Sequence, residues 1–406
     1  MPRSVSKSWD TFTDLKGYLA GGSSTNSKRP EFEDAEPALI VRGKGCRVWD
    51  LDGNEYIDFR NALGPVTLGY TIEEINNAVI DQLKQGIIFG HPHPLEGEVA
   101  KMLTEVLPCA ERARFLKTGG EAIAATIKIA RNATQRNKII QSGYNGWLNT
   151  LSMPKGTQPR GVSSAQPLKG VPQEISNLHM SLPWGDLEEW ENVFFEQGED
   201  IAAAVIACSA ADMKQGYEFL PAVRALTEQY GTLLIMDEIV TGFRLAIGGA
   251  HEYFDIMPDM AVFGKGLANG MPIAAYTGKG ELLDSAPDIG ITSTFGGETL
   301  SLAASKAAIE FYKQNNVIDY LWEAGESLWN STQKLGEEHD IPIEFKGVPV
   351  CPVISFEKQE LRNMFFKLSY QNGISLYDVP YINFSHKESD IEETLERFEK
   401  VFQGLG

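Results

Sequence analysis

Residues 232–276 read TLLIMDEIVTGFRLAIGGAHEYFDIMPDMAVFGKGLANGMPIAAY, and this stretch decides the fold class of the chain. It contains three short apolar runs, at 232–236, 261–263 and 272–276. Short apolar runs bounded by glycine, proline or acidic residues are typical of strands buried on both faces. We therefore expect three buried strands in this stretch.

The same pattern extends toward the N-terminus, where short apolar runs alternate with longer segments of helical periodicity. Further strands are expected at 114–116, 138–140 and 201–207, with helices that end near residue 131 and span 217–230. Strands that alternate with helices predict an α/β fold, in which helices on both faces cover a mainly parallel sheet.

The two ends of the chain have a different pattern. Residues 47–59 read RVWDLDGNEYIDF, and the two alternating stretches around Asp52-Gly53 predict a β-hairpin. Near the C-terminus, Ser389-x-x-Glu392 precedes a helical apolar stripe and predicts a capping box.

A length of 406 residues fits one large domain and a smaller one. We expect a large domain at 66–299 and a small α+β domain at 300–406. The N-terminal segment at 1–65, made of loop and hairpin, is expected to join the small domain.

Composition excludes several function classes. The net charge of -19 disfavours nucleic acid and anionic membranes as partners. No signal peptide and no apolar run long enough to span a bilayer is visible. The histidines show no HExxH spacing, so no catalytic metal is expected. The four cysteines are Cys46, Cys109, Cys208 and Cys351. They are scattered and form no CxxC pair, which fits a reducing cytoplasm.

Two candidate sites are a glycine turn and a strand-end carboxylate. The turn Thr118-Gly119-Gly120 lies between a strand and a helix, where backbone N–H groups can bind phosphate. Taken alone, it is better explained as a tight strand-to-helix turn without a ligand. Asp237 ends an apolar strand, where open α/β sheets bind ligands and a carboxylate can keep a pyridine ring protonated. A helix cap or a salt bridge is the alternative for Asp237.

Two further candidates are a lysine and a tyrosine between glycines. Lys265 lies in FGKG (263–266), where desolvation would make its amine nucleophilic; a solvated turn lysine is the alternative. Tyr144 lies in SGYNGW (142–147), where it could stack on a flat cofactor or fill a loop.

The order of these four features along the chain is more specific than any one of them. With it, the chain resembles the class III aminotransferases of pyridoxal 5'-phosphate (PLP) fold type I, most closely the group around glutamate-1-semialdehyde 2,1-aminomutase. The segments that carry the resemblance are MDEIVTGFR (236–244), FGKGLANGMP (263–272) and STFGGE (293–298). It covers nearly the whole chain, from about residue 21 to the last helix.

The resemblance implies roles for the side chains around the cofactor ring. Lys265 would form the Schiff base with PLP and then move the proton at the substrate carbon. Asp237 would pair with the pyridine nitrogen and keep it protonated. Ile239 and Tyr144 would cover the two faces of the ring, and Asn145 would belong to the same cofactor site.

The phosphate group is expected to lie at the glycine turn. Thr118, Gly119 and Gly120 match the phosphate-binding turn of the family. Thr294 matches a threonine that reaches the phosphate from the other subunit. The resemblance therefore implies a homodimer with shared active sites.

Departures from the aminomutases bear on the substrate. The usual Ser-Gly-Thr turn ends here in Gly120, and the usual Tyr-His-Gly contains Asn145. Leu63 replaces a tryptophan, and Lys28 or Arg29 aligns with the carboxylate-binding arginine. Leu63, Lys28 and Arg29 are thus the candidate substrate-binding residues.

These departures favour an aminotransferase over an aminomutase. The expected reaction moves an amino group from an amino acid donor to a keto or aldehyde acceptor, within specialised biosynthesis. Intramolecular amino transfer, as in the aminomutases, is the first alternative. A racemase or epimerase is the next, and a non-catalytic PLP-binding protein remains open because Cys208-Ser209 replaces the usual Glu-Pro.

Overall fold

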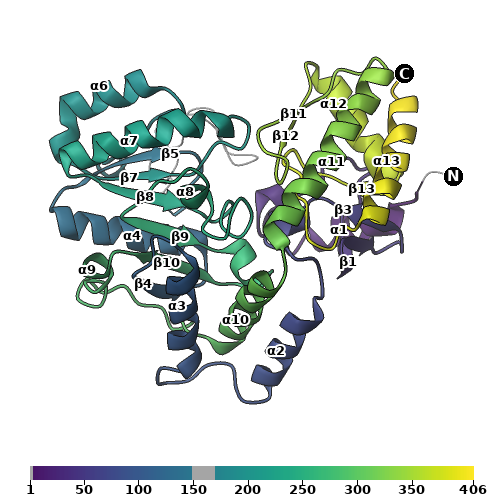
Figure 1. The fold of residues 1–406 in the computed structure, drawn as a ribbon. Helices are drawn as coiled ribbons and strands as arrows, with labels where there is room; N and C mark the ends of the chain where they lie inside the picture. Colours follow the sequence, from purple (N-terminus) through teal and green to yellow (C-terminus); the bar gives the residue numbers. More distant parts are fainter. Residues whose placement is uncertain (1–2, 149–169) are drawn as a thin grey trace. The chain divides into compact units, whose positions relative to one another are not determined.

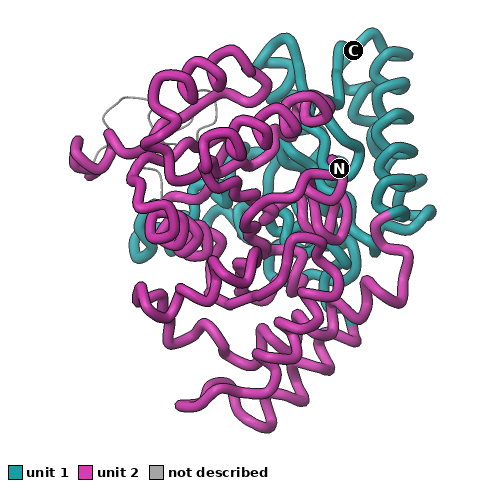
Figure 2. The backbone as a smooth tube through the Cα atoms, turned by 60° about the vertical axis from the view of Figure 1, so that its left-hand side comes forward, with its two compact units in different colours: residues 1–72, 319–406 teal, residues 73–318 magenta. Residues whose placement is uncertain are grey.

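A computed structural model describes residues 3–148 and 170–406 of the chain. The chain forms two compact units, shown in two colours in Figure 2. Unit 1 comprises Met1–Ile72 and Asp319–Gly406, and unit 2 comprises Glu73–Ile318. The domain boundaries predicted from the sequence are 65/66 and 299/300. Helix α10 (Thr299–Gln314) belongs to unit 2, where it packs against α2 (Glu73–Leu83) and α3 (Pro94–Val106).

Unit 2 is built on a seven-stranded sheet in the order β4-β10-β9-β8-β7-β5-β6. All neighbouring strands run parallel except β10, which is antiparallel to both β9 and β4. The mainly parallel α/β sheet predicted from the sequence is thereby confirmed. The strands are β4 (Arg112–Leu116), β5 (Lys138–Ser142), β6 (His179–Ser181), β7 (Ile201–Ile206), β8 (Leu233–Asp237), β9 (Met260–Phe263) and β10 (Ala274–Gly278).

Helices cover both faces of this sheet (Figure 1). Helix α4 (Gly119–Thr134) packs on the central strands, while α6 (Leu187–Gln197) and α7 (Gly216–Tyr230) lie together on the opposite face. Every residue of β7 is buried, since a parallel strand with helices on both faces meets no water. The short helices of unit 2 are α5 (Gln173–Ser176), α8 (Ala250–Tyr253) and α9 (Gly280–Leu283).

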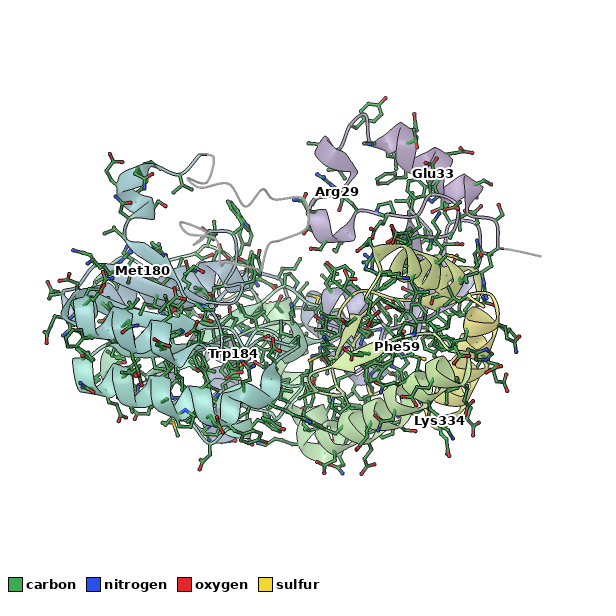
Figure 3. The ribbon with its side chains drawn as sticks, turned by 90° about the horizontal axis from the view of Figure 1, so that it is seen from above. Arg29, Glu33, Phe59, Met180, Trp184 and Lys334 are labelled. Carbon is green, nitrogen blue, oxygen red and sulfur yellow. The ribbon has the colours of Figure 1, made fainter. Side chains whose placement is uncertain are left out.

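Unit 1 combines segments from the two ends of the chain. The predicted hairpin forms from β2 (Arg47–Asp50) and β3 (Glu55–Asp58), and β13 (Ile374–Ser375) pairs in parallel with β3. Phe59 stacks on His386 with ring centroids 4.4 Å apart, among the enclosed side chains of this unit (Figure 3). The other elements are β1 (Ile40–Lys44), β11 (Glu344–Lys346), β12 (Val353–Ser355), α1 (Ser6–Leu15), α11 (Val317–Glu338), α12 (Gln359–Gln371) and α13 (Glu388–Gln403).

The start of α13 corrects one expectation. The predicted capping box at Ser389 and Glu392 is wrong, because the helix already begins at Glu388. The backbone N–H of Lys387 donates to Asp390 Oδ2 at 3.1 Å. A carboxylate at the third helical position provides the reciprocal bond two residues earlier than the sequence pattern indicated.

Within residues 3–148 and 170–406, none of the helices combines the length and the apolar character that a membrane crossing needs.

Candidate active site

Strands β8 and β9 bring two of the predicted site residues to one edge of the sheet. The two strands are parallel, with Asp237 opposite Val262. Asp237 is the last residue of β8, and Lys265 follows the end of β9 by two residues. The carboxyl ends of parallel strands share an edge, and open α/β sheets bind their ligands there. Asp237 and Lys265 therefore lie on the edge where a ligand is expected.

Asp237 is a buried carboxylate with two hydrogen-bond donors. The amide of Asn145 donates from Nδ2 to Oδ2 at 3.2 Å, and the backbone N–H of Ile239 donates to Oδ1 at 3.1 Å. Burial raises the pKa of Asp237 to about 6, although both hydrogen bonds and the charge of Lys265 oppose the rise. Each oxygen keeps a lone pair that a further donor can use.

Lys265 has an unusual backbone conformation. It is half-buried, and its φ of 44° lies in the left-handed region that non-glycine residues rarely adopt. It begins a short 3-10 turn (Lys265–Ala268) directly after Gly264. Strain of this kind persists where the surroundings enforce it and is common at functional sites.

Ile239 lies between the lysine loop and the glycine turn. A Cβ atom added to Gly264 would lie 3.7 Å from Cγ2 of Ile239, and one added to Gly119 would lie 2.2 Å from its Cδ1. Any larger residue at position 119 would have to displace Ile239. Gly119 therefore lets Ile239 approach the glycine turn closely, while Ile239 lies at ordinary contact distance from the loop of Gly264.

The glycine turn forms the N-terminus of α4. Thr118 is the N-cap residue, and its hydroxyl is engaged with Glu121: it accepts from the Glu121 N–H at 3.4 Å and donates to Oε2 at 3.0 Å. Gly119 and Gly120 occupy the first turn, where N–H groups point out of the helix. The structure thus places all three predicted phosphate residues at a helix start, the location that favours an anion.

Tyr144 and Asn145 lie on the loop after β5. Gly146 has a φ of 88°, and a Cβ atom there would lie 2.9 Å from the Cα of Gly120, so this loop packs directly on the glycine turn. Tyr144 is 45% exposed, and partial burial and the charge of Asp237 raise the pKa of its hydroxyl. Asn145 is 2% exposed, and its Oδ1 is buried without a hydrogen-bond partner.

Thr294 is exposed in the turn that precedes α10, within unit 2. Lys28, Arg29 and Leu63, the predicted substrate-binding residues, all belong to unit 1. Lys28 and Arg29 are exposed, and Figure 3 labels Arg29 in the N-terminal segment. The guanidinium of Arg29 packs on Gly21, where a Cβ atom would lie 2.2 Å from Nη2.

Leu63 lies in a run of backbone with positive φ, which continues through 61–64 with values of 45°, 51°, 71° and 103°. Asp58 holds the start of this turn, because its carboxylate accepts from the N–H groups of Arg60 and Asn61, each at 3.1 Å. The Asn61 side chain is fully buried and bonds to the amide of Asn383 at 2.7 Å. Leu63 is thus presented by a strained turn that a buried polar network enforces.

The sequence did not predict the structural role of Glu238, the neighbour of Asp237, which bonds to residues around the start of α8. Glu238 is fully buried, and its Oε1 lies 3.0 Å from Nδ1 of His251. Burial alone lowers the pKa of His251, but the neighbouring Cys109 and Glu238 raise it to about 10. Glu238 also accepts the Ala250 N–H at 2.7 Å, and so it fixes the connection between Asp237 and α8. No local sequence pattern indicates that Glu238 contacts His251, because the two residues are 13 positions apart.

Comparisons with known proteins agree with this geometry. The glutamate-1-semialdehyde 2,1-aminomutase of Sulfurihydrogenibium sp. is 33% identical over 426 residues, which cover 98% of this chain and 99% of that one. The 3-aminobutyryl-CoA aminotransferase of Cloacimonas acidaminovorans is also 33% identical, over 97% and 95% of the two chains. A PLP-containing structure of the FumI protein of Sphingopyxis sp. MTA144 has the same fold, with a TM-score of 0.87 at 24% identity over 98% and 96%.

Fold and site together define a PLP-dependent transferase of fold type I. The family model for aminotransferase class-III matches residues 30–402, and the chain therefore belongs to that family. It is accordingly an enzyme that uses PLP.

The residues at the sheet edge fit this cofactor. The glycine turn provides helix N–H groups for a phosphate, and it has the close backbone approach that an added Cβ would fill. Asp237 keeps lone pairs for a ring N–H, and the unpartnered Oδ1 of Asn145 provides a further buried acceptor beside it. Lys265 provides the amine on the same edge.

We expect Asn145→Ala to weaken PLP binding by about tenfold, because it removes one of the two donors that favour the ionised form of Asp237. The pKa of Asp237 should rise further as a result. The measurement is a titration of the protein with PLP, followed by absorption, at several pH values. Asn132→Ala, at an exposed position of α4, is the matched control. Equal affinity in the two variants would show that Asn145 does not act on Asp237.

We expect Gly146→Ala to reduce both stability and PLP affinity. A positive φ costs a residue with a Cβ about 1–2 kcal/mol, and here the added carbon also pushes the backbone of Gly120 away. Gly53→Ala is the matched control, because Gly53 has a φ of 92° with nothing within 4 Å of the added carbon. Thermal melting should show a loss in both variants. A loss of PLP affinity should appear only at position 146, and its absence there would contradict the packing of the loop on the glycine turn.

Proposed function

We propose that this enzyme transfers an amino group from an amino acid donor to a keto or aldehyde acceptor, with Lys265 attached to PLP and Asp237 at the pyridine nitrogen. The observation that carries the proposal is the position of Asp237. Its buried carboxyl ends β8, is held by Asn145 and Ile239, and shares a sheet edge with Lys265. Bound PLP would supply an electron sink for the negative charge that develops at the substrate carbon.

The side chains around the ring would each perform a separate task. Asp237 holds a proton at the ring nitrogen, because an adjacent carboxylate favours the charged pyridinium in a buried setting. The amine of Lys265 would take and return the proton at the substrate carbon. Ile239 and Tyr144 would restrict the ring from its two faces.

The phosphate would be bound by the N–H groups of Gly119 and Gly120, with Thr118 closing the turn. Since the Thr118 hydroxyl is engaged with Glu121, the backbone N–H groups and the helix start provide most of the attraction. Thr294 of a second subunit would complete this phosphate site.

A homodimer is supported by a group of exposed apolar side chains in unit 2. They lie on α2, on the loop that follows it and in the 293–298 turn. A hydrogen bond from the N–H of Thr299, directly after this turn, to the Ile87 carbonyl at 2.8 Å joins the turn to the loop. An apolar surface of this kind, next to Thr294, suits a second copy of the chain. The residues are Ile80, Leu83, Ile87, Ile88, Phe89 and Phe295. A cytoplasmic location is proposed because all four cysteines are free.

An aminomutase is the second candidate, because relatives with that activity are about as similar to this chain as a relative that is an aminotransferase. Leu63, Lys28 and Arg29 are the proposed substrate-binding residues. Leu63 replaces the tryptophan of the aminomutases, and their carboxylate-binding arginine aligns with Lys28, or with Arg29 if one residue is inserted. We therefore favour an intermolecular transfer, with a substrate from specialised biosynthesis.

The experiment is an absorption spectrum of the purified protein with PLP, followed by addition of glutamate alone. A visible band that bleaches on conversion of the cofactor to its amine form supports transamination. Product formed from an amino aldehyde without any added donor would instead establish the aminomutase. A band that ignores glutamate and other amino acids, with no turnover of any kind, would overturn the proposed reaction.

A further inference from the structure

Lys117 lies directly before the glycine turn but was not among the predicted site residues. Its ammonium donates to Oε1 of Glu298 at 2.8 Å and to the carbonyl of Pro272 at 3.1 Å. The side chains of this ion pair are only 17% and 10% exposed. The pair is thus largely withdrawn from water, where an ion pair is screened least.

The two partners of Lys117 belong to two of the three segments that carry the family resemblance. Glu298 ends the STFGGE turn, which contains Thr294. Pro272 ends the FGKGLANGMP segment, which contains Lys265. One ammonium group therefore joins the start of the phosphate turn to both loops.

Glu298 has a second task, because it caps α10. Its carboxylate accepts from the N–H groups of Leu300 at 2.9 Å and Ser301 at 3.0 Å. The hydroxyl of Ser301 donates to the same Pro272 carbonyl, at 3.1 Å. The turn before α10 is consequently tied to its neighbours by charge-assisted bonds rather than by apolar packing.

The backbone of this turn fits closely against β4. A Cβ atom added to Gly296 would lie 2.7 Å from the carbonyl oxygen of Phe115, two residues before Lys117. A shift of the 293–298 turn would therefore disturb the strand that leads into Thr118. Lys117 acts at the place where the two segments already touch.

We propose that Lys117 is a positioning residue for the cofactor site, which holds the phosphate turn, the loop after Lys265 and the turn of Thr294 in one arrangement through Glu298 and Pro272. This inference rests on the proposed PLP site. In this proposal the effect of the ion pair on PLP is transmitted through the three loops that it joins.

The test compares PLP affinity with the stability of the cofactor-free protein. Lys117→Met keeps the length of the side chain but removes its charge. We expect the dissociation constant for PLP, measured well below the melting temperature, to rise about tenfold. The melting temperature without PLP should also fall, because Glu298 is left largely buried without its charge partner. Lys117→Arg should restore most of the affinity. Lys313→Met is the matched control, because it breaks an exposed ion pair between Lys313 of α10 and Glu105 of α3.

Three outcomes would overturn the inference: an unchanged PLP affinity in Lys117→Met, an equal loss in Lys313→Met, or a PLP affinity of Lys117→Arg as weak as that of Lys117→Met. If Lys117→Met does not fold, Glu298→Gln tests the same pair from its other side, since the amide still caps α10. Failure of the wild-type protein to bind PLP would refute the proposed function instead, so the two failures are distinguishable.

Discussion

Lys265→Ala is expected to abolish the covalent attachment of PLP and to reduce turnover by at least about 10³-fold. Lys265 is the residue on the shared edge of β8 and β9 that can supply both the attaching amine and the proton carrier at the substrate carbon. The segment 263–272 contains no second lysine that could replace it.

The measurement has two parts. Reduction of the PLP-loaded protein with borohydride, followed by peptide mass analysis, should find the label at position 265 in the wild type and at no position in the variant. Turnover is then measured with the donor identified from the absorption experiment. Lys306→Ala, at an exposed ion pair with Glu98, is the control and should behave as the wild type. A label elsewhere, or turnover in Lys265→Ala at the wild-type rate, would remove Lys265 from the proposed role.

Asp237→Asn is expected to reduce turnover by about 10³-fold while the protein still binds PLP weakly. The variant keeps the shape of the side chain but removes the charge that holds a proton on the ring nitrogen, so the ring withdraws electrons less effectively. Asp237→Ala should show the same loss. Single-turnover rates with saturating PLP separate this effect from weaker binding. A rate near that of the wild type would refute the pairing of Asp237 with the ring.

The same variant should be more stable than the wild type when no PLP is present. The pKa of Asp237 is raised from 3.8 to about 6, so the folded protein binds an extra proton between these values. The free energy of unfolding of the wild type therefore falls as the pH rises from about 4 to about 6, and the loss persists above that range. Asp237→Asn does not undergo this loss. Its free energy of unfolding should therefore exceed that of the wild type by on the order of 3 kcal/mol at pH 8.

Denaturant unfolding of the two cofactor-free proteins at pH 4 and pH 8 measures this difference. The advantage of Asp237→Asn should be small at pH 4 and large at pH 8, and added PLP should stabilise the wild type more than the variant. A constant difference between the two pH values would mean that Asp237 does not titrate in this window.

Several features of the candidate site follow from local sequence alone. The apolar runs before Asp237 and Lys265 predicted β8 and β9, and parallel strands place their carboxyl ends on one edge. The glycines at 119 and 120 predicted a close backbone approach at a helix start, which α4 provides. In each case the chemistry depends on the residue and its immediate neighbours.

Contacts between loops could not be predicted in this way. Three such contacts join distant segments. Asn145 and Asp237 are 92 positions apart, Gly119 and Ile239 are 120 apart, and Lys117 and Glu298 are 181 apart. Periodicity reports whether a residue is buried, but it does not report which other loop lies beside it. The shift of the α13 cap shows the same limit at short range, because two acidic residues compete for one role.

The sequence by itself determined the fold class, because burial patterns are local properties, and its resemblance to the class III aminotransferases indicated PLP as the cofactor. The sequence also supplied Lys265 and Asp237 as the residues proposed to act on that cofactor. The tertiary structure decided how Asp237 is held, that Lys117 bonds to both Glu298 and Pro272, and how strained the turn of Leu63 is. These depend on strand order and on close packing between distant segments, and the energy of such contacts exists only once the chain has folded.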